Sequence, residues 1–243
     1  MSNFPKISAL GDHGILVRFE EKIESDTLKT VLEFRELIEN QNIKGVVEVT
    51  NTYNSLLISY DTTIENVYGE ILSLFASGGS TNIPKKNNYK IFYLPVCYDM
   101  EFGLDLDHIS KVKNLYPEEV ISLHTAPLYQ IYFIGFMPGF LYLGGLDERL
   151  HIARKNTPRK LVEKGAVGIG GNQTGIYPKN SPGGWQILGK SPLNFFDKNS
   201  VPPSPFSPGD KIIFEAITKE EYFKIEEQIS NGNYTLKTEI VDG

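Results

Sequence analysis

Two arginines in a glycine- and proline-rich stretch are the residues of this chain best suited to hold a small anion. Arg154 and Arg159 flank an Asn-Thr-Pro segment. A guanidinium binds a carboxylate or phosphate through two parallel hydrogen bonds and stays charged at any working pH. The alternative is a structural ion pair, for which only Glu163 is near in sequence. We favour ligand binding for both arginines, with Arg159 as the first candidate.

A glycine-bounded turn supplies an amide, and the residues after it supply aromatic rings. Gln173 follows the run Gly170-Gly-Asn172, and its side-chain amide both donates and accepts, which suits recognition of another amide. Tyr177 and Trp185 each offer a large flat face with one polar handle, although core packing explains them equally well. Because glycine lets a ligand approach the backbone closely, this composition indicates a rigid, concave binding surface.

The remaining reactive residues do not complete a catalytic set. His124 lies near the end of a predicted helix, where a capping or core role is commoner than proton transfer, and we keep it as the last of the binding candidates. Cys97 follows an apolar strand and is expected to be a small buried side chain. The four histidines are too dispersed for metal-ligand spacing, and no phosphate loop occurs. We therefore expect no metal or prosthetic group in this chain, and we assign no catalytic residue.

The composition is that of a soluble globular protein. Of 243 residues, 40% are hydrophobic and 22% are charged, and the net charge of −6 argues against nucleic-acid binding. The segment from Arg149 to Lys211 nevertheless carries ten lysines and arginines against three acids. Such a region attracts an anionic small molecule or an acidic partner, unless it is only a solvated lysine-rich face. With a single cysteine, no signal-peptide pattern and no membrane-spanning apolar run, we expect a cytoplasmic location without membrane contact.

The first part of the chain predicts a small α+β unit. Its order β-α-β-β-α resembles a ferredoxin-like split unit, which a strand near Ile91 to Val96 would close. The helices are expected to begin at Ser25 or Asp26 and at Thr62 or Thr63. The predicted elements are a strand at 14–19, a helix to about residue 40, strands at 46–50 and 55–60, and a helix to about residue 75.

A small, polar segment from Ala76 to Asn88 is the best linker candidate, so we divide the chain into domains 1–84 and 85–243. Short apolar runs broken by glycine and proline follow, and they suggest a barrel or a sandwich. The elements predicted here are strands at 89–96, 129–135, 165–170, 175–177, 186–188 and 211–216, and helices at 105–112, 117–125 and 219–229.

Four motifs follow one another in the second half of the chain: Gly135-Phe-Met-Pro-Gly-Phe-Leu-Tyr-Leu143, Thr157-Pro-Arg159, Gln173-Thr-Gly-Ile-Tyr-Pro178 and Pro182-Gly-Gly-Trp185. In this order they closely resemble the allophanate hydrolase subunit 1 family, which includes the B-type component of 5-oxoprolinase and a bacterial inhibitor of a sporulation histidine kinase. The ending Pro208-Gly-Asp-Lys-Ile-Ile-Phe214 is similar to the last strand of that family.

The resemblance implies a fold of class α+β, in which a small ferredoxin-like N-terminal domain precedes a cyclophilin-like β-barrel domain. It also implies a hetero-oligomeric enzyme. With an A-type subunit and a C-type subunit, which is related to allophanate hydrolase subunit 2, such chains resemble an ATP-dependent 5-oxoprolinase that opens pyroglutamate to glutamate. ATP is then a co-substrate of the complex, and this chain is expected to be inactive alone. Two alternatives stay open: an inhibitor that binds the helical dimerisation domain of a histidine kinase, and a subunit related to allophanate hydrolase or urea carboxylase.

Limited proteolysis is expected to cut the chain first between Ala76 and Asn88 and to leave two folded pieces. The Gly-Gly-Ser-Thr run and the lysines after it are typical of an exposed linker. Mass spectrometry of the fragments after brief trypsin treatment locates the cuts. First cuts elsewhere, with this segment intact, would show that the two-domain division is wrong.

Overall fold

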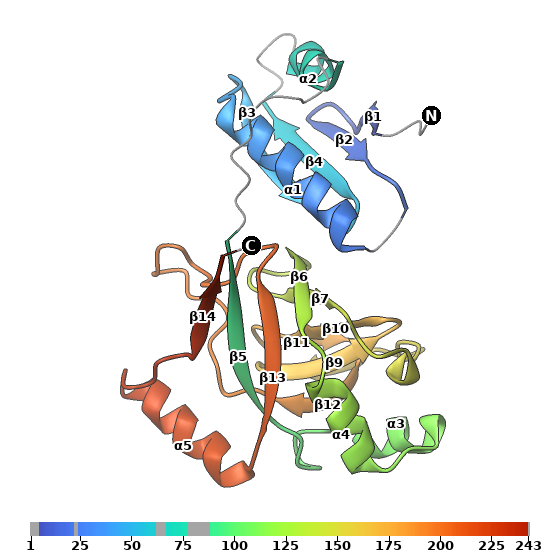
Figure 1. The fold of residues 1–243 in the computed structure, drawn as a ribbon, viewed down its shortest axis with the longest axis vertical. Helices are drawn as coiled ribbons and strands as arrows, with labels where there is room; N and C mark the ends of the chain where they lie inside the picture. Colours follow the sequence, from blue (N-terminus) through green and yellow to red (C-terminus); the bar gives the residue numbers. More distant parts are fainter. Residues whose placement is uncertain (1–4, 22–23, 62–66, 77–87, 243) are drawn as a thin grey trace. The chain divides into compact units, whose positions relative to one another are not determined.

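The computed structural model describes residues 5–21, 24–61, 67–76 and 88–242. The chain divides into two compact units, Met1–Asn87 and Asn88–Gly243, which can be followed by colour in Figure 1. Residues 77–87, which make up most of the predicted linker, lie outside the described residues. Independent folding of the two units therefore stays a prediction.

In its described residues, the N-terminal unit has a four-stranded antiparallel sheet and two helices. Strand order is β1-β2-β4-β3. Alternate strand residues, such as Ile15 and Val17 in β2, are buried with Val31 and Ile38 of α1, as the period of two in a half-buried strand requires. The elements are β1 (Lys6–Ala9), β2 (Gly14–Arg18), α1 (Ser25–Asn40), β3 (Val46–Asn51), β4 (Ser55–Tyr60) and α2 (Val67–Ala76).

Two predictions for this unit are wrong. The strand near Ile91 to Val96 does not close the sheet, because β1 pairs with β2 at that edge and the later strand is buried in the second unit. Neither Ser25 nor Asp26 caps α1, since Glu24 holds the cap position with extended backbone and no side-chain hydrogen bond. The predicted start of α2 at Thr62 or Thr63 lies outside the described residues.

The second unit is a closed seven-stranded barrel. The strand order is β12-β9-β10-β7-β6-β13-β5, and a pairing of β12 with β5 at Cys97 closes it. Strand β14 pairs with the beginning of β5, from Tyr89 to Phe92. The α+β prediction, a small ferredoxin-like unit followed by a cyclophilin-like barrel, is confirmed. The strands are β5 (Tyr89–Cys97), β6 (Tyr129–Ile134), β7 (Leu141–Gly144), β9 (Ala166–Gly170), β10 (Gln173–Ile176), β12 (Gln186–Lys190), β13 (Lys211–Ile217) and β14 (Thr238–Val241).

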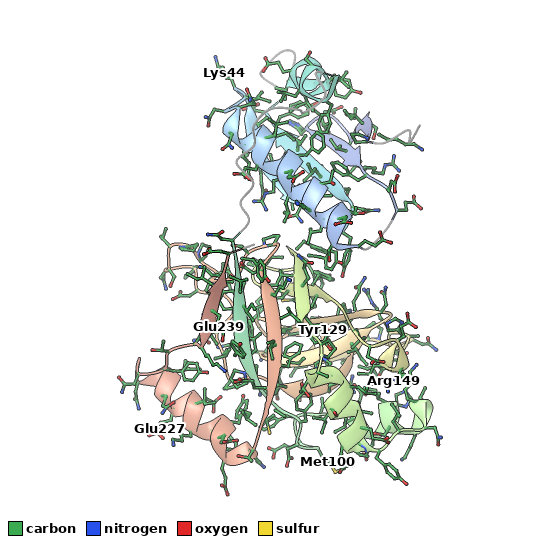
Figure 2. All side chains as sticks on the ribbon, viewed as in Figure 1. Lys44, Met100, Tyr129, Arg149, Glu227 and Glu239 are labelled. Atoms are coloured by element: carbon green, nitrogen blue, oxygen red, sulfur yellow. The ribbon has the colours of Figure 1, made fainter. Side chains whose placement is uncertain are left out.

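The barrel has an apolar interior and is flanked by helices. Buried side chains such as Leu94, Ile131 and Ile169 fill the interior together with Tyr129, which Figure 2 labels within this unit. Helix α3 (Leu106–Lys113) contacts β12, α4 (Pro117–Thr125) contacts β13, and α5 (Lys219–Ser230) contacts β5. No helix in the described ranges is long and apolar enough to cross a membrane.

A second apolar cluster lies outside the barrel wall. Buried rings and aliphatic side chains pack there, including Phe140, Tyr177 and Trp185. Near it, strands β8 (Arg159–Val162) and β11 (Ser181–Gly183) form a two-stranded sheet, and a 3-10 turn, η1 (Glu148–Leu150), precedes them. Sequence patterns did not predict β1, β7, β8, β11 or β14, because each spans only three or four residues and shows no clear alternation.

Gly165 is expected to tolerate no side chain. Its φ is +83°, its N–H donates to the carbonyl of Tyr177, its carbonyl accepts from Ser191, and an added Cβ would lie 2.2 Å from the Ser191 carbonyl oxygen. Gly171 also has a positive φ (+68°), but open space surrounds its Cβ position. We expect Gly171→Ala to cost about 1–2 kcal/mol of unfolding free energy, from backbone strain alone. Gly165→Ala should cost clearly more, and equal losses in urea unfolding would contradict the steric argument.

Candidate functional site

The side chain of Trp185 packs against glycines of two neighbouring strands. A Cβ at Gly168 or Gly170 of β9 would come within 3.2 Å of the tryptophan, and a Cβ at Gly175 of β10 would come within 3.0 Å. Phe140 packs edge-on against the same ring, with centroids 5.5 Å apart. Trp185 is only 4% exposed, so it is a wall of the candidate site and not an open stacking platform.

Arg154 is the exposed cation of this surface. Its Cζ lies 5.2 Å from the centre of the Trp185 ring, and its Cγ sits against Gly170. It makes no hydrogen bond or ion pair within the ranges 5–21, 24–61, 67–76 and 88–242. Its guanidinium is therefore available to donate hydrogen bonds to an anionic ligand. Burial raises the pKa of the neighbouring Tyr142, and the positive charge of Arg154 opposes this rise.

Arg159, the first candidate from sequence, is engaged in an ion pair. Its Nη2 donates to Asp105 Oδ1 at 2.6 Å, and Lys155 Nζ donates to the same oxygen at 3.1 Å. The other terminal nitrogen, Nη1, is buried and has no hydrogen-bond partner in the part of the chain that the structure describes. The acid predicted as the alternative partner, Glu163, pairs instead with Lys190 at 2.6 Å.

Gln173 and Tyr177 belong to the same face of the barrel. Gln173 pairs with Gly170 across the β9–β10 ladder, and its Oε1 is buried without a hydrogen-bond partner among the residues described. Tyr177 is buried beneath this surface, edge-on to Phe140 and against Gly183. Burial raises the pKa of the Tyr177 phenol, while a hydrogen bond from the Trp185 backbone and the charge of Arg154 lower it. Its hydroxyl is therefore neutral at working pH.

His124 faces the barrel interior and does not join this surface. It is 0% exposed, and its ring stacks on Phe214 at 4.7 Å. Nε2 lies 3.0 Å from the hydroxyl of Thr174, which donates its own proton to the Gly168 carbonyl, so Nε2 carries the imidazole proton. Nδ1 then accepts from Tyr98 at 2.8 Å. We therefore leave His124 out of the proposed site and interpret it as a core residue, held by Tyr98 and Thr174.

The sequence analysis assigned two neighbours of the site to no binding role. From sequence, Asp105 is only the beginning of a helix, and its partner Arg159 is 54 residues away along the chain. Tyr142 lies within one of the family motifs, and its placement opposite Gly175 in the β7–β10 ladder brings it to this surface. Only the tertiary structure shows that both belong to the site.

The assembled groups can bind an anion beside an amide. A guanidinium supplies charge-assisted hydrogen bonds, and a buried unpaired Oε1 favours a ligand N–H, since unsatisfied buried groups are rare in native proteins. No cluster of three or more potential metal ligands occurs among the described residues. Two hollows of about 450 and 730 Å³ lie on the N-terminal unit, and no candidate residue lines either of them.

Comparisons with known proteins agree with this architecture. Residues 5–206 match the family described as carboxyltransferase domain, subdomain C and D. The chain is 36% identical over 236 residues to the 5-oxoprolinase B subunit of Bacillus subtilis (strain 168), covering 92% of this chain and 97% of that protein. A crystal structure of a conserved uncharacterized protein from Pyrococcus horikoshii is 38% identical, with a TM-score of 0.53 and coverage of 89% and 100%. Urea amidolyase of K. lactis is 25% identical with a TM-score of 0.82; 97% of this chain aligns to 16% of that much longer one.

The fold and these matches define a mixed α/β protein with a closed seven-stranded barrel and a separate small sheet. The chain belongs to the carboxyltransferase subdomain C and D family, and the resemblance to allophanate hydrolase subunit 1 and to B-type 5-oxoprolinase proteins is thereby confirmed.

Burial of His124 should make the protein less stable at mildly acidic pH. Burial lowers the pKa of His124 from 6.5 to about 3, so between these values the unfolded chain binds a proton that the folded chain excludes. The contribution of this residue to the free energy of unfolding therefore keeps its full value above pH 6.5 and decreases as the pH falls from 6.5 toward 3. At pH 5 the loss is about 2 kcal/mol of unfolding free energy.

Urea unfolding at pH 7.5 and pH 5 measures this loss. We expect His124→Gln to be less stable at pH 7.5 but to lose less between the two pH values than the natural chain. His108→Gln, which changes an exposed histidine on α3, serves as the matched control and should keep the full loss. An unchanged pH dependence in His124→Gln would show that the buried imidazole is not the cause.

Proposed function

We propose that this chain is the B-type component of an ATP-dependent 5-oxoprolinase, which hydrolyses 5-oxo-L-proline to L-glutamate together with A- and C-type subunits. The observation that carries the proposal is the 36% identity to the 5-oxoprolinase B subunit along nearly the full length of both chains. The match to urea amidolyase supports a role within a larger enzyme, since this chain aligns to only 16% of that protein. We place the complex in the cytoplasm, where the buried Cys97 stays a free thiol.

The surface around Arg154 suits the chemistry of this substrate. 5-Oxoproline has a carboxylate and a ring amide, and we assign the carboxylate to the Arg154 guanidinium. We assign the ring N–H to the Oε1 of Gln173, which has no partner among the described groups. In this proposal Trp185 and Tyr177 pack beneath Arg154 and Gln173 and hold them in place. Arg159 offers the N–H groups of its unpaired Nη1 as further donors to the substrate.

The partners supply the phosphate chemistry in this proposal. In this proposal the partners hydrolyse ATP with one water to ADP and phosphate, and this drives the addition of a second water across the ring amide, which breaks the C–N bond and gives glutamate. The negative charge that develops on the amide oxygen lies next to the cations of this chain. We therefore assign binding and orientation of the substrate to this chain, with ATP as co-substrate of the whole complex. Turnover then needs all three subunits.

Phosphate release in a reconstituted complex tests the function. We expect release that depends on both ATP and 5-oxoproline when this chain is coexpressed with A- and C-type subunits, and no release from this chain alone. Glutamate formation, measured in the same samples by chromatography, links the phosphate to ring opening. Equal turnover by the purified single chain would contradict the proposal.

Arg154→Ala tests the site within that complex. Loss of a charge-assisted hydrogen bond costs about 1.5–3 kcal/mol, so kcat/KM for 5-oxoproline should fall about 10- to 150-fold. Arg154→Lys should recover only part of the loss, because lysine keeps the charge but not the planar fork. Arg149→Ala is the matched control, since that exposed arginine pairs with Asp147 in its own turn. Equal effects of Arg154→Ala and Arg149→Ala would remove Arg154 from the site.

A further inference from the structure

The loop that carries Arg154 is held to the barrel on both sides of that residue. Before it, Ile152 and Gly171 exchange two backbone hydrogen bonds of 3.1 and 2.7 Å. After it, the N–H of Lys155 donates to the carbonyl of Gly184 at 2.7 Å. These backbone contacts fix where the loop runs, but they do not hold the side chains that follow Arg154.

Asp105 holds two of those side chains with one carboxylate. Its Oδ1 accepts from both Lys155 and Arg159, and its Oδ2 accepts from the backbone N–H of Ile187 at 2.7 Å. The N–H of Asp105 donates to the Ile187 carbonyl at 2.9 Å, so the residue is fixed to β12 at two points. With a side chain only 4% exposed, Asp105 is a rigid anchor between α3, β12 and the cationic loop.

We propose that Asp105 is the positioning residue of the candidate site. By anchoring Lys155 and Arg159 to β12, it keeps Arg154 on the face of Trp185 with its guanidinium free for an anionic ligand. The proposal rests on the proposed function only for the identity of that ligand. The position of Arg154 can be measured without any turnover.

The charges of the loop explain why a carboxylate is needed here. Arg154, Lys155 and Arg159 lie within six residues, and like charges at this spacing repel. Asp105 offsets part of this repulsion from below the loop, which leaves the exposed Arg154 as the cation available to a ligand. Burial raises the pKa of Asp105, but the hydrogen bonds from Arg159, Ile187 and Lys155 lower it on balance, so the carboxylate stays ionised.

Fluorescence of Trp185 reports the position of Arg154 directly, because it is the single tryptophan of the chain. We compare the purified chain with three variants. Asp105→Asn removes the charge at nearly constant shape, Arg154→Met gives the signal of an indole without its guanidinium, and Asp107→Asn changes an exposed acid in the first turn of α3 as the matched control. Circular dichroism confirms that each variant is folded.

We expect the emission of Asp105→Asn to shift toward that of Arg154→Met, with easier quenching of Trp185 by acrylamide, while Asp107→Asn matches the natural chain. In the active complex, Asp105→Asn should raise KM for 5-oxoproline about 10-fold and leave kcat nearly unchanged, as expected for a residue that supports a binding group. A folded Asp105→Asn chain with an unchanged Trp185 signal would overturn the proposal, and so would a loss of kcat alone.

Lys155→Met decides the question if Asp105→Asn does not fold. This variant removes one of the two cationic contacts and leaves Asp105 paired with Arg159. We expect a smaller shift of the Trp185 signal in the same direction, and no shift would overturn the proposal. If the natural complex shows no 5-oxoproline-dependent turnover, the proposed function fails, but the Trp185 comparison still tests Asp105.

Discussion

Closure of the seven-stranded barrel is the constraint on which the second unit depends. β5 pairs in parallel with β13 along seven residues and meets β12 at Cys97 and Lys190, which removes the free sheet edges that would otherwise need cover. A closed wall has an inner and an outer face, and successive residues of a strand alternate between them. In β10, Thr174 contacts the interior histidine, whereas Gly175 lies under the outer aromatic cluster. The candidate site therefore follows from which residues face outward.

Packing on the outer face explains three glycines of strands β9 and β10. Trp185 lies against Gly168, Gly170 and Gly175, and a methyl group at any of these positions would push against the tryptophan or against backbone. From the sequence alone, these glycines suggest a close approach between a ligand and the backbone. In the structure, the protein's own tryptophan makes that close approach, and Arg154 and Gln173, the candidate binding groups, lie next to these glycines.

The cations of the basic segment have different roles despite their similar chemistry. Arg159 is held by a buried carboxylate, whereas Arg154 is exposed and contacts an aromatic face. Asp105 thus engages Arg159 in an ion pair and leaves Arg154 free for the proposed anionic ligand. The same arrangement links α3 to β12 and to the loop that carries Arg154, so the position of Arg154 depends on the packing of the barrel unit.

Local patterns were sufficient for the elements that have a clear period or a terminal signal. The strand Ser55–Tyr60 and the helix that begins at Pro117 occur with the predicted bounds, because alternation and a first-turn proline act within a few residues. The family motifs likewise predicted the barrel and drew attention to Arg159, Gln173 and Trp185, whereas Arg154 was a candidate because of its residue type.

Tertiary structure alone decided which candidates meet and what each one does. The partner of Arg159 lies 54 residues away, His124 points into the core through contacts with Tyr98 and Thr174, and the edge strand of the small sheet comes from the N-terminus. Each of these outcomes depends on strand register and barrel closure, which bring distant residues together. Residue type and spacing therefore determined which groups are candidates for binding, and the closed barrel determined where those groups point, because a side chain's direction depends on the face of the strand that carries it.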